Sequence, residues 1–269
     1  MKKQSALLEN NLLNIPANHT GSYLLDLSKA DKEVCVSIGQ NSSVDLLLLG
    51  LRNENNISIN IDDNSSVKLS ALVLDLVTDF CINANVNENS TLNAYLADFI
   101  IGKCKGKIDV NLNKENATIN WLSSSLSINN DNKELDVSVN HNSPRTFAQI
   151  DSYGVCRNNG KLLFSGICHI FNGSHGSKAH QNAKIMVFDK VSNGIARPIL
   201  KIDDNDIEAS HAAIVGKIND EHIFYLTSRG LSEDEAKRLI TLGYLKPILK
   251  GFDDEDIRNE IEQLIEGGR

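Results

Sequence analysis

One motif recurs four times along the chain, and this repeat limits the possible folds more than any other feature. In each copy, a run of alternating apolar and polar residues leads to a polar turn, which is followed by Asn, a small residue, Ser or Thr, and an aliphatic residue. Alternation places every second side chain on the same face of a strand, so each run predicts a strand with one buried face. The turn asparagines are Asn41, Asn64, Asn89 and Asn116, which lie 23, 25 and 27 residues apart.

Self-similarity at this period indicates a solenoid, a propeller or an array. No helical pattern interrupts residues 34–190, which excludes solenoids built from helix pairs. Two architectures remain: a β-helix, whose coils stack so that like positions form ladders, and a meander of hairpins packed as a sandwich. The uneven repeat length favours the β-helix, because insertions can be confined to one corner, and stacked asparagines can satisfy one another. We therefore expect a mainly β fold with a β-helix core over 31–205, preceded by a lead-in or cap over 1–30.

Residues 206–269 have a different character. Ser232 and Glu235 form a capping-box pattern, and apolar residues then recur at helical spacing as far as Gly243. A second helix is expected to start near Asp253 and to end at Gly267. Two short amphipathic helices in this position could cap the solenoid or could dock a partner.

Charge and cysteine content narrow the class of function. The chain has 27 Lys and Arg against 35 Asp and Glu, which gives a formal charge of −8. Binding to nucleic acid or to anionic lipid needs a basic surface, so this acidic balance argues against both. The basic N-terminus is broken at Glu9 before a signal-peptide core forms, and no run approaches the ~20 apolar residues of a membrane helix. The chain has 5 cysteines, an odd number, and no two of them form a CxxC motif. This pattern fits reduced cytosolic thiols better than a framework of disulfides. We expect a cytoplasmic protein that binds neither nucleic acid nor membrane.

Several residues could carry chemistry. Histidine and cysteine are common zinc ligands, but the spacing of those between residues 168 and 180 matches no helical or knuckle motif. This favours a polar turn with a buried thiol over a metal site. His211 lies among small and apolar residues, where a histidine is usually structural. We find no P-loop, no dinucleotide-binding glycine motif, no GxSxG and no HExxH. The clustered candidates are Cys168, His169, His175 and His180, and the cysteines expected to be small core residues are Cys35, Cys81 and Cys104.

Five phrases occur in a fixed order between His141 and about Leu249. They are Phe164-Ser165-Gly166, Ala179-His180-Gln181-Asn182, the runs 196–202 and 203–216, and Phe224-Tyr225-Leu226-Thr227-Ser228-Arg229-Gly230-Leu231. In this order they resemble the SufB/SufD family of iron–sulfur cluster assembly scaffolds. The SufB branch carries a cysteine near the position of Asn182, where this chain has none, so the resemblance is SufD-like. The N-terminal half resembles the family only in its β-repeats, and the chain is expected to lack the N-terminal helical region of typical members.

The resemblance implies a right-handed parallel β-helix followed by a small helical region. It also implies a non-enzymatic scaffold subunit that pairs with a SufB-like paralogue or with itself and binds a SufC-like ABC ATPase through its C-terminal helices. Sulfide would come indirectly from a cysteine desulfurase. An iron–sulfur cluster would form transiently at the level of the complex, with none held tightly by this chain alone.

The resemblance also implies roles for individual residues. His211 matches a SufD-side histidine at the dimer interface, although the family's preceding cysteine is here Ala209 and its S-H-G-A-T-V-G is Ser-His-Ala-Ala-Ile-Val-Gly. For cluster assembly and the dimer interface we expect His211, Ser210 and Glu208, and for a metal His211 and Cys168. The expected ATPase-docking residues are Tyr225, Arg229, Leu231, Ala236, Leu239, Ile240 and Tyr244.

Two other functions are compatible with a β-helix. One is an enzyme acting on polysaccharide, which would need a cluster of carboxylates on one solvent face. The other is a structural solenoid without metal chemistry. The acidic residues that could serve the enzyme are Asp62, Asp63, Asp203, Asp204 and Asp206.

Overall fold

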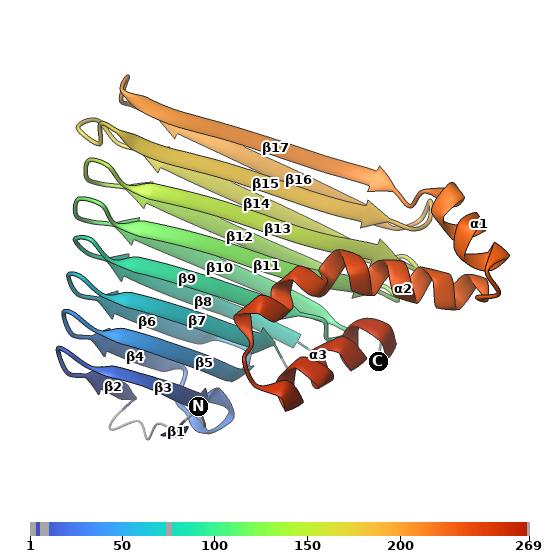
Figure 1. Ribbon diagram of the computed structural model, residues 1–269, viewed down its shortest axis with the longest axis horizontal. Coiled ribbons are helices and arrows are strands. Elements are labelled where there is room, and N and C mark those ends of the chain that lie inside the picture. The colour runs from blue at the N-terminus through green and yellow to red at the C-terminus, as the bar shows by residue number, and fades with distance from the viewer. Residues whose placement is uncertain (1–3, 6–10, 74–76, 268–269) are drawn as a thin grey trace.

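The computed structural model describes residues 4–5, 11–73 and 77–267, and within them the chain forms a β-solenoid of two parallel sheets (Figure 1). Successive strands alternate between a nine-stranded sheet, here the odd sheet, and an eight-stranded sheet, the even sheet. The odd sheet consists of β1 (Gln4–Ser5), β3 (Thr20–Asp26), β5 (Ser43–Leu51), β7 (Ser66–Val73), β9 (Thr91–Asp98), β11 (Thr118–Ile128), β13 (Phe147–Arg157), β15 (Ser177–Val187) and β17 (Ile207–Lys217). The even sheet consists of β2 (Leu12–Ile15), β4 (Glu33–Ile38), β6 (Asn55–Ile61), β8 (Val77–Val86), β10 (Lys103–Leu112), β12 (Asn132–His141), β14 (Lys161–Ile170) and β16 (Asn193–Ile202).

The pairing settles the choice between the two predicted architectures. Neighbouring strands in both sheets run parallel, whereas a meander of hairpins would pair them antiparallel. The alternation buries one face of each strand: in β6, Ile57, Ile59 and Ile61 have no exposed surface, and the residues between them are half-buried. A continuous core of mostly aliphatic side chains therefore fills the space between the two sheets. Each large apolar side chain that is fully buried stabilises the fold by about 1.5–3 kcal/mol.

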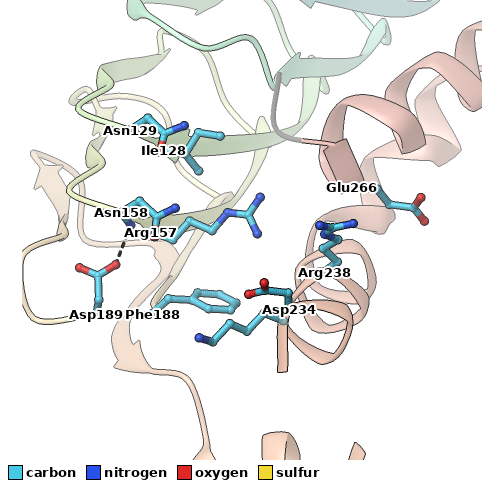
Figure 2. Close-up of a pocket in the computed structure, with 10 residues that line it drawn as sticks. Ile128, Asn129, Arg157, Asn158, Phe188, Asp189, Asp234, Arg238 and Glu266 are labelled. Carbon is cyan, nitrogen blue, oxygen red and sulfur yellow. Dashed lines mark hydrogen bonds between the residues drawn. The ribbon is translucent and has the colours of Figure 1, made fainter. Parts of the chain in front are cut away.

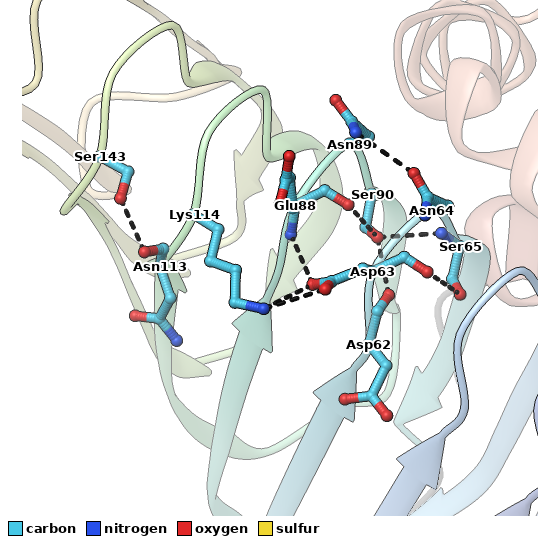
Figure 3. A network of polar contacts seen from close by, with 10 residues as sticks. All are labelled: Asp62, Asp63, Asn64, Ser65, Glu88, Asn89, Ser90, Asn113, Lys114 and Ser143. Carbon is cyan, nitrogen blue, oxygen red and sulfur yellow. Dashed lines mark hydrogen bonds and ion pairs between the residues drawn. The ribbon is translucent and has the colours of Figure 1, made fainter.

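The repeated asparagines occupy the turns that lead from the even sheet to the odd sheet. Asn41, Asn64, Asn89 and Asn116 all have left-handed backbone, with φ between 53° and 58°, a conformation that asparagine tolerates better than most residues. The Asn116 amide donates to the Asn89 Oδ1 at 2.9 Å, and Asn89 donates to Asn64 at 3.2 Å. Figure 3 shows this part of the turn edge, where the Ser90 hydroxyl also accepts the Ser65 N–H at 2.9 Å. The predicted asparagine ladder is confirmed, on the exposed edge of the solenoid.

The solenoid is longer than the 31–205 range expected from the sequence. Strands β2 and β3 already pair with β4 and β5, so the coils begin within the segment that we assigned to a lead-in, of which 1–3 and 6–10 lie outside the described residues. At the other end, β17 extends the odd sheet to Lys217. In β17, Ile207 and Ala209 face inward and pack against the core, as the alternation requires. After His211 the strand continues with small residues, so the apolar–polar alternation is weak in this part of the sequence.

Helices follow β17 and fold back along the solenoid. They are α1 (Asp220–Ser228), α2 (Glu233–Leu245), the 3₁₀ helix η2 (Lys246–Gly251) and α3 (Glu255–Gly267). Figure 1 shows α2 and α3 lying across the outer face of the odd sheet, over its middle strands. The Ser70 hydroxyl donates to the Gly251 carbonyl, and Lys68 pairs with Asp253 at 2.6 Å. A second apolar core forms here between Leu72 and Leu122 of the sheet and helical residues that include Leu249, Phe252 and Ile261.

The expectation of two helices is partly wrong. The Ser232 capping box is present, with Ser232 N–H donating to Glu235 Oε2 at 2.8 Å. However, α2 passes Gly243 and leads into η2, and α1 precedes it, capped by the Asn219 side chain. The helices also cover the side of the solenoid and do not close its end. None of the helices in the described ranges is long and apolar enough to cross a membrane.

Candidate functional site

The last coil, formed by β16 and β17, is the open end of the solenoid. Each of these strands pairs on one side only, β16 with β14 and β17 with β15. An edge strand presents backbone N–H and C=O groups that another strand can pair with. Large apolar side chains are also exposed here: Ile214 is 55% exposed and Val215 is 47% exposed. The open end therefore combines a long edge strand with apolar surface, as a protein–protein contact requires.

His211 lies on β17 with its side chain at the end of the core. It pairs in register with Gln181 of β15, which is only 3% exposed, and it has the same parity as Ala209, which packs against the core. The inner column below it runs from Trp121 through Ile150 to Gln181, so it changes from apolar to polar over the last two coils. His211 itself is exposed because no further coil covers it.

Glu208 and Ser210, which we grouped with His211, contact the neighbouring strand through their side chains. The Lys178 ammonium lies 2.8 Å from Glu208 Oε2, and this hydrogen bond holds the pKa of Glu208 below its ordinary value. The Ser210 hydroxyl lies 2.8 Å from His180 Nδ1. By strand alternation both residues face away from the side that His211 faces. The open end therefore presents His211 at the mouth of the core and a separate charged strip on its flank.

Cys168, the second residue of the expected metal pair, is enclosed in the core. It lies on β14 between Val139 and Leu200 in register and has no exposed surface. Burial raises the pKa of its thiol to about 12, so it is protonated at neutral pH and is a poor metal ligand in this form. The structure therefore does not bring Cys168 and His211 together at the surface.

The histidines near Cys168 have separate partners. His169 lies 2.7 Å from Asp203 through Nε2 and stacks on Phe171, and His180 contacts Ser210. His175 is exposed near Asp204. Within the described ranges, no group of three or more His, Cys, Asp or Glu side chains converges as a metal site would.

The remaining cysteines divide between core and surface. Cys104 and Cys156 are buried, and burial raises the pKa of both thiols, that of Cys156 to about 12. Cys35 and Cys81 are half-buried on the outer face of the even sheet, so our expectation that they belong to the core is wrong. The alternation of the strand explains the exposure of Cys35: its neighbours Val34 and Val36 point into the core, so the Cys35 side chain points outward.

The expected ATPase-docking residues fall into an outward and an inward set. Tyr225 and Leu239 are 56% and 50% exposed, and the Arg229 guanidinium stacks over the Tyr225 ring at 5.2 Å. Leu231 and Ile240 are half-buried. Ala236 is fully buried, and Tyr244 packs edge-on against Tyr153 of β13, with ring centroids 6.0 Å apart.

Sequence reasoning missed the most exposed aromatic residue of this surface. Phe224 on α1 is 74% exposed and directly precedes Tyr225. An amphipathic pattern does not reveal it, because α1 has no buried residue among its nine. The sequence does contain a helix-start signal here: Asn219 is suited to cap the N-terminus of α1, and acidic residues occupy its first turn.

The five acidic residues that could serve a polysaccharide enzyme do not converge in one cluster. Asp62 and Asp63 follow β6, whereas Asp203 to Asp206 follow β16, five coils away, which corresponds to roughly 24 Å at the spacing of paired strands. Asp63 pairs with Lys114 at 2.9 Å (Figure 3), and Asp203 pairs with His169. The two carboxyl groups of a glycosidase lie within about 10 Å of each other. The acidic turns therefore act as local ion pairs and caps.

A known protein family matches most of the chain. The family model described as "SUF system FeS cluster assembly, SufBD core domain" matches residues 28–244. The chain belongs to this family. The match begins near the first complete coils, runs through the open end with His211, and reaches into α2.

Individual relatives match a shorter part of the chain. The iron–sulfur cluster assembly protein SufD of Bacillus subtilis is 33% identical over 114 residues, which is 42% of this chain and 26% of that protein. A SufBD family protein of Mycobacterium tuberculosis is 34% identical over 126 residues, 47% of this chain and 15% of that protein. One from Staphylococcus haemolyticus is 32% identical over 110 residues, 41% of this chain and 24% of that protein. The matched part thus spans about a quarter or less of each of these relatives.

Proposed function

We propose that this protein is a non-enzymatic scaffold subunit of a SUF-type iron–sulfur cluster assembly complex. The observation that carries the proposal is the open end of the solenoid, where an uncovered edge strand places His211 at the mouth of the core. Membership of the SufBD core family supports it. In this proposal the cluster is the cargo of the complex, and sulfide reaches it indirectly from a cysteine desulfurase.

The proposed pairing surface is β17 with its exposed apolar side chains. A second strand laid along its 11 residues would satisfy the free backbone groups and cover Ile214 and Val215. The partner is a SufB-like paralogue or a second copy of this chain, and in a symmetric pair the same strand would serve both subunits. In either arrangement His211 would lie at the junction of the two solenoids.

His211 is proposed as this chain's contribution to the transient cluster. Imidazole is an established ligand of iron in such clusters, and thiolates are the usual ones. Cys168 is buried and protonated, so we expect the thiolates to come from the partner subunit. This arrangement would make cluster assembly a property of the pair.

The SufC-like ABC ATPase is proposed to bind the outward residues of α1 and α2. Phe224, Tyr225 and Leu239 each expose a large apolar side chain there, and the Arg229 guanidinium stacks over the Tyr225 ring. Elsewhere on α2, Ala236 is buried and Tyr244 packs against Tyr153 of the solenoid. A movement imposed on these helices by ATP hydrolysis would therefore be transmitted to the solenoid and to its open end.

Three separate measurements test the proposal. For pairing, Ile214→Glu is expected to lower the mass of the complex seen by light scattering, whereas Leu12→Glu, an exposed leucine at the opposite end of the solenoid, leaves it unchanged. For the cluster, anaerobic reconstitution of the purified complex with iron and sulfide should give a lower yield with His211→Ala. An unchanged yield removes the role assigned to His211.

The docking of the ATPase is tested by co-purification. Phe224→Ser is expected to reduce recovery of the SufC-like ATPase, because it removes the most exposed apolar side chain of α1. Val191→Ser, which alters a similarly exposed residue in the turn after β15, serves as the control. Equal recovery with both variants would contradict the docking surface without affecting the pairing result.

A further inference from the structure

A cavity of about 310 Å³ separates the solenoid from helix α2, and it shares no residue with the open end (Figure 2). The solenoid wall includes Arg157, the last residue of β13, and Phe188, which follows β15. The helix wall includes Asp234 and Arg238 of α2. A volume of this size is at the lower end of the range for small-molecule sites.

Arg157, which lines this cavity, has one unsatisfied donor. Its Nε is shielded from solvent and has no hydrogen-bond acceptor in the described part of the chain. Burial lowers the pKa of this guanidinium, and the nearby charge of Arg238 lowers it further, against a smaller opposing effect of Asp234. A buried cationic donor without an acceptor is unfavourable, so an anion at this position would be stabilised.

Within the described residues, none of the three carboxylates that line the cavity, Asp189, Asp234 and Glu266, forms an ion pair with Arg157. The carboxylate of Asp189 is already engaged: Oδ2 accepts the Asn158 N–H, and Oδ1 accepts those of Val191 and Ser192. Arg238 has no ion pair or side-chain hydrogen bond within the described residues. Figure 2 shows the Arg157 side chain extending from the solenoid toward the part of α2 that carries Arg238.

We propose that this cavity binds a small monoanionic carboxylate, held between the guanidinium groups of Arg157 and Arg238, with its apolar part against Phe188. A carboxylate matches the donor geometry of a guanidinium and would satisfy the Arg157 Nε–H. Asp234 and Glu266 also line the cavity, and their negative charges would repel a dianion such as phosphate about twice as strongly as a monoanion. Because the two arginines belong to β13 and α2, the ligand would also link the helix to the sheet.

The test is a calorimetric titration of the full chain with three probes. Benzoate, an aromatic monoanion, is expected to bind in a saturable manner. Benzamide, which has the same shape without the charge, and inorganic phosphate are each expected to bind at least about tenfold more weakly.

Variants locate the site. Arg238→Gln and Arg157→Gln are each expected to weaken benzoate binding by about tenfold or more, because each removes a charge-assisted hydrogen bond. Arg258→Gln, which changes an exposed arginine of α3 outside the cavity, is the matched control and should bind like the unaltered chain. Arg157→Lys keeps the charge but lacks the Nε–H, so it should also bind more weakly, and the fluorescence of the sole tryptophan reports whether each variant is folded.

Several results would overturn the proposal. They are the absence of saturable benzoate binding, equally tight binding of benzamide or phosphate, and equal affinity of the folded Arg238→Gln and Arg258→Gln variants.

Discussion

A buried ion pair in the middle of the solenoid gives the sharpest prediction about stability. Lys133 at the start of β12 donates to Asp98 Oδ1 at 2.7 Å, and the two side chains are 2% and 5% exposed. Removing one partner of such a pair leaves an uncompensated charge in the core, which typically costs about 3–5 kcal/mol. We therefore expect Lys133→Met to lower the free energy of unfolding by about that amount.

The double variant separates the pair from the packing around it. When Asp98→Leu is combined with Lys133→Met, no charge remains buried, and replacement of a buried pair by apolar residues is often neutral or stabilising. The double variant should thus regain most of the stability that the single variant loses. Lys105→Met is the control, because Lys105 forms an exposed pair with Glu134 at 3.9 Å, which is worth less than about 1 kcal/mol.

Denaturant unfolding followed by the fluorescence of Trp121 is a direct assay, since this residue is the only tryptophan and is 3% exposed. Loss of less than about 1 kcal/mol in Lys133→Met would refute the reasoning. So would a double variant that is as unstable as the two single variants added together.

Three further predictions concern the turns, the helices and pH. Asn89→Ala should destabilise the chain by about 1–2 kcal/mol more than Asn89→Gly in the same unfolding assay, because only glycine accepts the left-handed backbone at φ 53° without strain. Gly251→Ala places a new methyl group 2.3 Å from the Tyr95 ring, so hydrogen exchange should show loss of protection in η2 and α3 while β7 and β9 keep theirs. Burial lowers the pKa of His141 to about 4, so between that value and the ordinary pKa of 6.5 the unfolded chain binds more protons than the folded chain. The denaturant midpoint of unfolding should therefore fall as the pH is lowered from 6.5 to about 4. In the His141→Gln variant this fall should be smaller.

The sequence was sufficient to predict the solenoid because its signal is local. Alternation and the asparagine turns recur within each coil, so every repeat predicts its own strands and its own corner. The open end was harder to predict, since β17 contains the small residues Ala212 and Ala213, which weaken the alternation there.

The arrangement of the helices depends on contacts that the sequence does not display. Gly251 lies against Tyr95, and its carbonyl accepts from Ser70, 181 residues earlier in the chain. No periodicity within α2 or α3 indicates such a partner, so the sequence left open whether these helices cap the solenoid or dock a partner, and it did not indicate that they cover its side. The same limit applies to Ala236, which we expected to face the ATPase, because its burial depends on what lies beneath α2 in the folded chain.

The candidate site was predicted in part. His211 lies on the last strand with its side chain at the mouth of the core, but its proposed role in the cluster remains a prediction. Glu208 and Ser210 were expected to act with His211, but strand alternation turns their side chains to the opposite face, where they contact Lys178 and His180.

The most direct test of the account is hydrogen exchange of the β17 amides in the isolated chain and in the complex with its scaffold partner. If the open end is the pairing surface, residues 207–217 gain protection when the complex forms, and β2 at the opposite end does not. Unchanged exchange in β17, together with new protection elsewhere on the chain, would contradict the central claim.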